Sequence, residues 1–226
     1  RIVTSVTYPA LAKIQDDQKR LHSAFRQSLT ITFFIVAILM FGMAAVADSL
    51  VISLIGEKWR QSVLYLQMLC FIGLIYPLNS ININLLNVVG RSDLYMKLQL
   101  VSQLFTIPVV VFGVIYGIKI MIVGMCINSL LSYLYFSLVA SKYSKYNLRS
   151  QLNDIKTTLL ISAFMGSLVF LVGFITNFKP LITFIIQTIM GALIVFISGE
   201  LLKMREYIFI KETLITQYKT IIRKEN

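Results

Sequence analysis

The sequence predicts an all-α fold, a polytopic transmembrane helical bundle of about six spans. Of its 226 residues, 57% are hydrophobic and only 14% are charged, and the mean hydropathy is +0.79. Soluble domains are typically about 45–50% apolar and about 25% charged. Six spans of about 20 residues need roughly 120 residues, which leaves enough chain for the connections. This composition excludes a soluble globular domain, a disordered chain and a disulfide scaffold.

Six apolar segments are each long enough to cross about 30 Å of hydrocarbon as a helix. They lie within a bundle over 28–204, at 28–46, 63–89, 94–116, 118–140, 157–175 and 180–202. Residues 1–27 are expected to hold the end of a preceding span and then a charged loop at 16–26. Residues 48–56 are apolar but too short to cross, which predicts an interfacial or re-entrant turn.

The basic residues predict the orientation of the bundle. In this topology 17 lysines and arginines fall on one side of the membrane and four on the other. Because cytoplasmic loops carry the excess of Lys and Arg, the leading loop and the C-terminus are expected in the cytoplasm. The basic tail over 205–226 is either an interfacial amphipathic helix or a solvated extension. The net charge of +11 is spread over turns that meet anionic lipid headgroups, so membrane lipids are expected partners and nucleic acid is not.

The sequence offers little catalytic or metal-binding chemistry. Its one histidine, His22, lies in the charged loop, and its two cysteines, Cys70 and Cys126, lie within apolar segments. No Cys/His spacing suits a metal ion, and no glycine-rich phosphate loop follows a strand. We therefore predict no catalytic residue, no metal site and no cofactor.

Uncharged polar side chains form stripes at helical spacing on three successive spans. An unpaired amide in hydrocarbon is costly, so these stripes must face protein or water. They either form hydrogen bonds between packed helices or line a wet cavity, where amides suit sugar hydroxyls. The sugar-binding candidates are Asn79, Asn84, Asn87, Gln99, Gln103 and Asn128.

Two basic residues lie near the expected inner mouth of the bundle. Arg91 is in a turn, and Lys97 is about one helical turn into the next span. Arginine binds phosphate oxygens in bidentate fashion, and lysine supplies a mobile point charge. Arg91 and Lys97 are therefore either topology signals or ligands of a lipid diphosphate.

Six short motifs in order resemble a known family over about residues 6–120. They are YPALAKIQDD from Tyr8, AD from Ala47, LIGEKW from Leu54, LQMLC from Leu66, YPLN from Tyr76 and VGRSDL from Val89. The run is similar to Wzx-type polysaccharide flippases, the O-antigen and colanic-acid exporters. These belong to the multidrug/oligosaccharidyl-lipid/polysaccharide exporter superfamily.

The resemblance implies a MATE-like protein with two helical lobes, of which this chain corresponds to the C-terminal lobe. Such flippases carry undecaprenyl-diphosphate-linked oligosaccharide repeats across the bacterial inner membrane by alternating access. The expected partners are that lipid-linked oligosaccharide, an N-terminal lobe outside this chain and polysaccharide assembly proteins. Two alternatives stay open: a cation-coupled multidrug exporter of the same superfamily, and a membrane enzyme of polysaccharide assembly.

Overall fold

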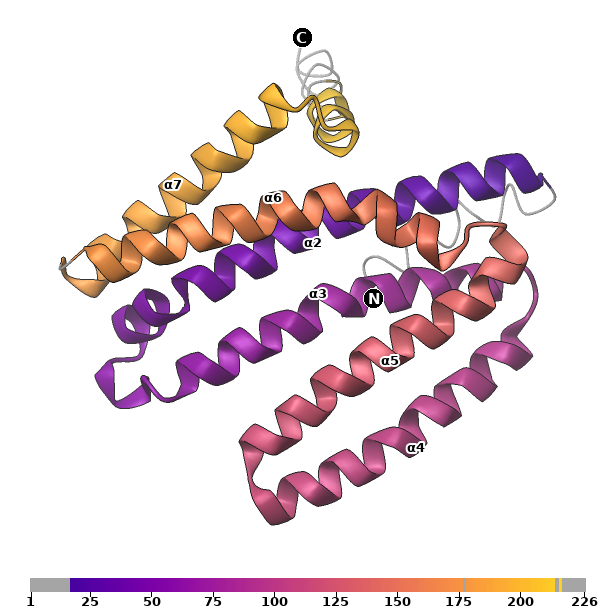
Figure 1. The fold of residues 1–226 in the computed structure, drawn as a ribbon, viewed down its shortest axis with the longest axis horizontal. Helices are drawn as coiled ribbons and strands as arrows, with labels where there is room; N and C mark the ends of the chain where they lie inside the picture. The colour runs from indigo at the N-terminus through magenta and orange to yellow at the C-terminus, as the bar shows by residue number, and fades with distance from the viewer. Residues whose placement is uncertain (1–16, 177, 214–215, 217–226) are drawn as a thin grey trace, which may run out of the picture.

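The computed structural model describes residues 17–176, 178–213 and 216, and this part of the chain is helical throughout, without strands. The helices are α2 (Gln18–Leu54), α3 (Ser62–Val88), α4 (Ser92–Tyr116), α5 (Ile118–Ser144), α6 (Leu148–Ile175) and α7 (Pro180–Leu201), as Figure 1 shows. A short 3₁₀ helix, η1 (Glu57–Trp59), follows α2, and residues 205–213 are helical after α7. All six long helices could cross a membrane by length and composition, which confirms the predicted all-α polytopic bundle.

Helix α2 is the centre of the bundle. It packs against α3 on one side and against α6 and α7 on the other, while α5 covers α3 and α4 lies outermost on α5 (Figure 1). Successive helices run in opposite directions, so α2, α4 and α6 all begin at the same end. We call this the basic end, because the turns there carry most of the basic residues outside the helices. The end where α3, α5 and α7 begin is called the outer end.

Helix α2 corrects two expectations about its flanks. The charged loop expected at 16–26 is helical from Gln18 onward, and 48–56 is mostly the last part of α2 rather than a separate turn. The Asp17 carboxylate caps the helix, accepting hydrogen bonds from the backbone N–H of Lys19 at 3.0 Å and of Arg20 at 3.1 Å. With 37 residues, α2 is about 55 Å long and extends beyond the hydrocarbon.

Other helix ends also extend past the apolar segments. Helix α6 begins at Leu148 rather than at 157, and α5 continues to Ser144 rather than ending at 140. In both places the helix continues into polar sequence because one face still packs on the bundle. The expected end of a preceding span, at 1–16, lies outside the described residues. Most of the 205–226 tail does too, so its amphipathic helix is described only for 205–213.

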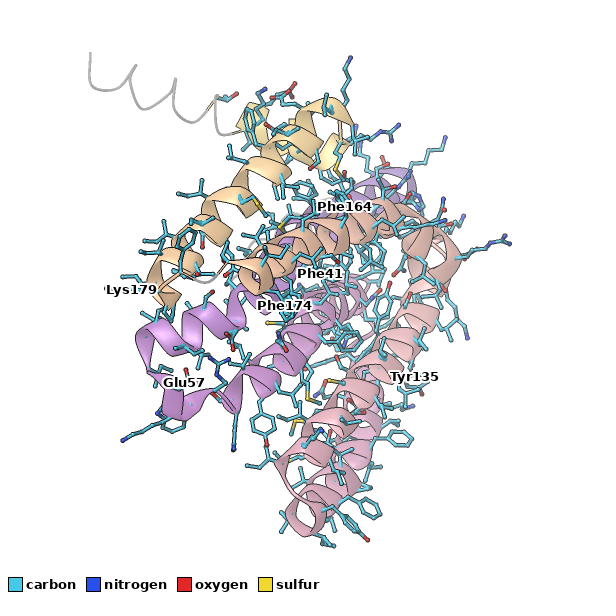
Figure 2. The ribbon with its side chains drawn as sticks, turned by 60° about the vertical axis from the view of Figure 1, so that its left-hand side comes forward. Phe41, Glu57, Tyr135, Phe164, Phe174 and Lys179 are labelled. Carbon is cyan, nitrogen blue, oxygen red and sulfur yellow. The ribbon has the colours of Figure 1, made fainter. Side chains whose placement is uncertain are left out.

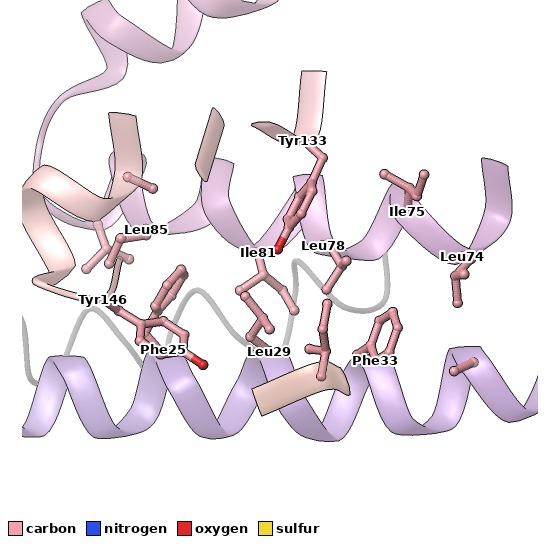
Figure 3. Packing of buried hydrophobic residues seen from close by; sticks show 14 of the residues in the cluster. Phe25, Leu29, Phe33, Leu74, Ile75, Leu78, Ile81, Leu85, Tyr133 and Tyr146 are labelled. Carbon is pink, nitrogen blue, oxygen red and sulfur yellow. The ribbon is translucent and has the colours of Figure 1, made fainter. Parts of the chain in front are cut away.

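The largest buried cluster holds α2, α3 and α5 together, as Figure 3 shows. Side chains at intervals of four residues along α2 point into it, and α3 presents a matching row. The members that Figure 3 labels are Phe25, Leu29, Phe33, Leu74, Ile75, Leu78, Ile81, Leu85, Tyr133 and Tyr146. This row extends into the charged part of α2, which explains why the helix begins there.

Helices α4 and α5 form a tight hairpin around two glycines. Gly117 is the only residue between them and has φ of +99°, a conformation that a glycine adopts without strain. Gly113 is buried against Met121, so that the two helices approach closely. The pair spaced as G-x-x-x-G therefore serves both for close packing and for the turn, the two roles that its spacing allows.

We expect the substitution Gly113→Ala to destabilise the protein by about 1–3 kcal/mol, the usual cost of overpacking. A Cβ atom at Gly113 would overlap the Cβ and Cγ atoms of Met121, which cannot swing away as a side-chain tip can. Thermal unfolding in detergent measures the effect. The matched control is Gly42→Ala, because an added Cβ atom there meets nothing within 4 Å. Equal melting temperatures for the two variants would contradict the prediction.

Candidate functional site

A polar cavity of about 930 Å³ lies at the basic end. The first turns of α2, the first turns of α6 and residues 202–212 enclose it. Its ionisable lining residues are His22, Arg26, Asp154, Lys203, Arg205, Glu206 and Glu212. We call it the basic-end cavity. The lining combines three strong cations with three carboxylates. An anionic ligand could take the place of a carboxylate beside one of these cations.

Arg26 and Asp154 form a bidentate ion pair across this cavity. Arg26 Nε donates to Asp154 Oδ2 at 2.7 Å, and Nη2 donates to Oδ1 at 2.6 Å. The Asp154 side chain is 16% exposed and that of Arg26 is 46% exposed. Because the two residues lie on α2 and α6, the pair joins these helices at their polar ends. Paired planar groups of this kind are among the stronger polar contacts in proteins.

Tyr146, in the turn between α5 and α6, completes the network. Its hydroxyl also donates to Asp154 Oδ2, and its ring packs edge-on against His22 and Phe25 of α2. Burial raises the pKa of the Tyr146 hydroxyl far above its usual range, and the Asp154 carboxylate raises it further. The hydroxyl therefore remains a protonated donor. His22 Nδ1 lies 3.0 Å from the backbone oxygen of Ser144 and so ties α2 to the same turn.

An apolar groove of about 600 Å³ runs along α2, α6 and α7. Its lining includes Ile38, Leu39, Gly42, Met43, Val46, Leu50, Met165, Val169, Phe184, Phe196 and Tyr207. On α2, Gln27 and Ile31 of the basic-end cavity are followed at helical spacing by Ile38 and Gly42 of the groove. On α6, Thr158 is followed in the same way by Met165. One row of residues on α2 and one on α6 thus run from the basic-end cavity into the groove.

The structure places the sugar-binding candidates outside both cavities. Asn84 is 1% exposed, and neither its Nδ2 nor Oδ1 of Asn79 has a hydrogen-bond partner among the described residues. Asn87 accepts a hydrogen bond from Ser92 at 3.3 Å. On α4, Gln99 is half-buried and Gln103 is exposed.

Asn128 takes part in packing between helices. Its Nδ2 donates to Thr106 Oγ1 at 3.0 Å, and Ser102 and Ser132 pair one turn away at 2.9 Å. Both bonds link α4 to α5. For this part of the stripes the contacts are interhelical hydrogen bonds, one of the two uses that the polar pattern allows.

The two diphosphate candidates from the sequence also lie outside the basic-end cavity. Arg91 donates to Asp93 at 3.0 and 3.2 Å, and its guanidinium lies 5.5 Å from the centre of the Tyr143 ring. Lys97 is exposed on α4. The cluster around Arg26 was missed because its residues were assigned to a loop. The signal was present in the four-residue spacing of Leu21 and Phe25, which predicts an amphipathic helix.

No group of three or more His, Cys, Asp or Glu side chains comes together for a metal ion within residues 17–176, 178–213 and 216. The cysteines Cys70 and Cys126 are both free thiols. What the site does supply is cationic and hydroxyl donors beside an apolar surface.

Comparison with known proteins points to polysaccharide biosynthesis. A family model described as "Polysaccharide biosynthesis protein" matches residues 1–64. Lipopolysaccharide biosynthesis protein WzxC of Escherichia coli (strain K12) is 33% identical over 112 residues, which are 50% of this chain and 23% of that protein. Part of the chain is thus similar to a lipopolysaccharide biosynthesis protein of the Wzx type.

Two further relatives are a membrane protein and a teichuronic acid biosynthesis protein by name. An uncharacterized membrane protein in the cps region of Klebsiella pneumoniae is 32% identical over 139 residues, covering 59% of this chain and 29% of that protein. Teichuronic acid biosynthesis protein TuaB of Bacillus subtilis (strain 168) is 25% identical over 178 residues, covering 78% of this chain and 37% of that protein. No solved structure matches the chain.

The matches span between 23% and 37% of these relatives, so the chain corresponds to little more than a third of their length at most. The family match over 1–64 includes all of α2, and with it Arg26. The central helix of the bundle, which lines both the basic-end cavity and the apolar groove, therefore lies within the part that the polysaccharide biosynthesis family model matches.

Proposed function

We propose that the protein moves undecaprenyl-diphosphate-linked oligosaccharide repeats across the bacterial inner membrane for lipopolysaccharide or exopolysaccharide assembly. It would do so by alternating access, as one lobe of a two-lobed transporter. The observation that carries the proposal is that one row of residues on α2 and one on α6 lead from the basic-end cavity into the apolar groove. A diphosphate lipid has the same order of parts, an anionic head followed by a long apolar chain.

The diphosphate would bind Arg26, Lys203 and Arg205. Lys203 takes part in no ion pair within the described residues, and Arg205 acts on the Asp154 carboxylate through its charge without forming an ion-pair contact, so both can turn to a ligand. Arg26 is held by Asp154, and a phosphate offers the same bidentate geometry with greater charge. The phosphate would thus replace the Asp154 carboxylate as the partner of Arg26. Asp154 would still accept the hydrogen bond from the Tyr146 hydroxyl.

The binding residues predicted from the sequence would make additional contacts with the same ligand. Arg91 and Lys97 would meet the diphosphate if it entered beside α4 rather than beside α6. The amides would contact sugar in a cavity that the second lobe completes. Gln103, which is exposed on α4, is the candidate amide open to such a cavity, whereas Asn84 is 1% exposed.

Binding of lipid ligands tests the proposal directly. Native mass spectrometry of the protein in detergent micelles would compare undecaprenyl diphosphate, undecaprenol and inorganic diphosphate. We expect undecaprenyl diphosphate to bind at least tenfold more tightly than either of the others, because it alone fills both the cavity and the groove. Equal retention of undecaprenol would contradict a site for the diphosphate.

The orientation makes a separate prediction. We expect reporter fusions after Lys119 and Lys179 to report the periplasm, and fusions after Lys145 and Lys224 to report the cytoplasm. The reason is the excess of basic residues on one side, which sets topology during insertion. Alkaline phosphatase and green fluorescent protein fusions measure the two sides. A cytoplasmic signal after Lys119 would contradict the arrangement.

A further inference from the structure

A second polar cavity, of about 460 Å³, lies at the outer end of the bundle. We call it the outer cavity. Its polar lining residues are Asp48, Ser49, Arg60, Gln67, Thr176, Thr183 and Gln187, and its aromatic ones are Phe170, Phe174 and Phe178. Asp48 is about 33 Å along α2 from Arg26, so the two polar cavities lie near opposite ends of the same helix. In Figure 2, Phe174 lies at the end of α6, in the same part of the molecule as Glu57 of η1.

A fixed hydrogen-bond chain forms the floor of the outer cavity. Ser49 Oγ donates to Gln187 Oε1 at 2.5 Å, and Gln187 Nε2 donates to the backbone oxygen of Val169 at 3.0 Å. Both side chains are buried, and they connect α2, α7 and α6. Gly173 allows the contact, since any side chain there would overlap the Gln187 amide. The floor is therefore rigid before any ligand arrives.

Three polar groups at the cavity have unused hydrogen-bonding capacity. Thr183 is 6% exposed, yet its hydroxyl forms no hydrogen bond within the part of the chain that the structure describes. Gln67 donates through Nε2 to the backbone oxygen of Ala44 at 3.1 Å, which leaves its Oε1 free to accept. Asp48 uses only Oδ1, in a 3.2 Å bond with Arg60. These groups offer one hydroxyl and two acceptors to a ligand.

The charge around the outer cavity disfavours a phosphate. Arg60 is already engaged by Glu57, at 2.5 and 3.2 Å, and by Asp48. The two charged residues of the lining, Asp48 and Arg60, pair with each other, so the lining presents no free cation to a phosphate. A ligand with many hydroxyl donors and no negative charge suits this setting. Phe174 and Phe178, both largely exposed, provide apolar faces against which the C–H face of a sugar ring can pack.

We propose that the outer cavity binds a neutral saccharide, with Asp48 and Gln67 accepting from sugar hydroxyls and Thr183 bonding to another. The proposal rests on the proposed function and deepens it. The saccharide would occupy the outer cavity after the diphosphate has left the basic-end cavity, because in the lipid the sugar and the apolar chain lie on opposite sides of the diphosphate. The outer cavity supplies a sugar site built from α2, α3, α6 and α7 that is separate from the amide stripes of α3, α4 and α5.

Trp59 provides a built-in probe of this site. It is the one tryptophan of the chain, and it precedes Arg60 of the cavity lining. Its fluorescence would be titrated with glucose, galactose and N-acetylglucosamine, using the protein in lipid nanodiscs. We expect a saturable change with at least one sugar. We expect Thr183→Val and Asp48→Asn each to weaken the apparent affinity at least fivefold, and Thr183→Ser to retain it.

Thr213→Val is the matched control. The Thr213 hydroxyl donates to the backbone oxygen of Phe209 at 2.7 Å, and this residue lines neither the outer cavity nor the apolar groove, so the variant should bind sugar as tightly as the unaltered protein. No saturable change with any sugar, or equal affinity in Thr183→Val, would overturn the inference. Binding of undecaprenyl diphosphate is measured on the same samples. Its retention without a sugar response rejects the outer site alone, whereas loss of both in the unaltered protein rejects the proposed function as well.

Discussion

Replacing Arg26 with alanine is expected to weaken the binding of undecaprenyl diphosphate at least tenfold and to destabilise the protein by about 1–2 kcal/mol. The loss of affinity follows from removing a charge-assisted bidentate contact, since tenfold corresponds to about 1.4 kcal/mol. The loss of stability follows because Asp154, 16% exposed, keeps its charge without its partner. Native mass spectrometry and thermal unfolding measure the two effects.

An exchanged pair separates stability from binding. We expect Arg26→Asp combined with Asp154→Arg to recover most of the stability but little of the affinity, because the guanidinium would then project from α6 rather than from α2. Arg20→Ala is the control, since Arg20 forms only an exposed pair with Asp17 at 3.3 Å. Such pairs contribute little. Full recovery of affinity in the exchanged pair would mean that the site needs only a cation somewhere in the cavity.

Filling the apolar groove is expected to have the second large effect. Gly42 lines the groove, and an added Cβ atom there meets nothing within 4 Å, so Gly42→Phe would occupy the groove without disturbing helix packing. We expect the affinity for undecaprenyl diphosphate to fall about tenfold, because the ring takes the volume of several isoprenoid carbons and their dispersion contacts. The affinity for inorganic diphosphate should not change.

Leu104→Phe on α4 is the matched control for this substitution. Leu104 is 64% exposed and lies outside the groove, so the added ring faces the surroundings of the bundle. Both variants should keep the melting temperature of the unaltered protein. Unchanged affinity for the lipid in Gly42→Phe would show that the chain of the lipid lies elsewhere.

Hydropathy predicts the number and approximate position of the helices well, and it predicts their ends poorly. The beginnings of α2 and α6 were missed because both are polar outside the bundle and apolar only toward it. Leu21 and Ile155 are buried there, and each belongs to a row that recurs every three or four residues. Reading that period through charged sequence would have extended both helices.

The candidate site was less accessible to sequence reasoning than the fold. Arg26 and Asp154 are 128 positions apart, and nothing in their local sequence distinguishes them from other charged residues near span ends. Their pairing depends on α6 returning to pack beside α2. For the polar stripes, the helical period correctly predicts that Asn128 faces a polar partner. The period alone does not distinguish a neighbouring helix from a ligand as that partner.

The hairpin of α4 and α5 has a consequence for biogenesis. Helix α4 is the least buried of the six long helices, and its polar Ser102 and Thr106 find partners on α5. During synthesis α4 leaves the ribosome before α5 exists, so the Ser102 hydroxyl would face lipid without its partner, whereas the Thr106 hydroxyl still donates to the backbone oxygen of Ser102 within α4. With only Gly117 between the two helices, the favourable course is for the insertion machinery to release them into the bilayer as a pair. Helices α6 and α7, which are translated after this hairpin, would then join the bundle last.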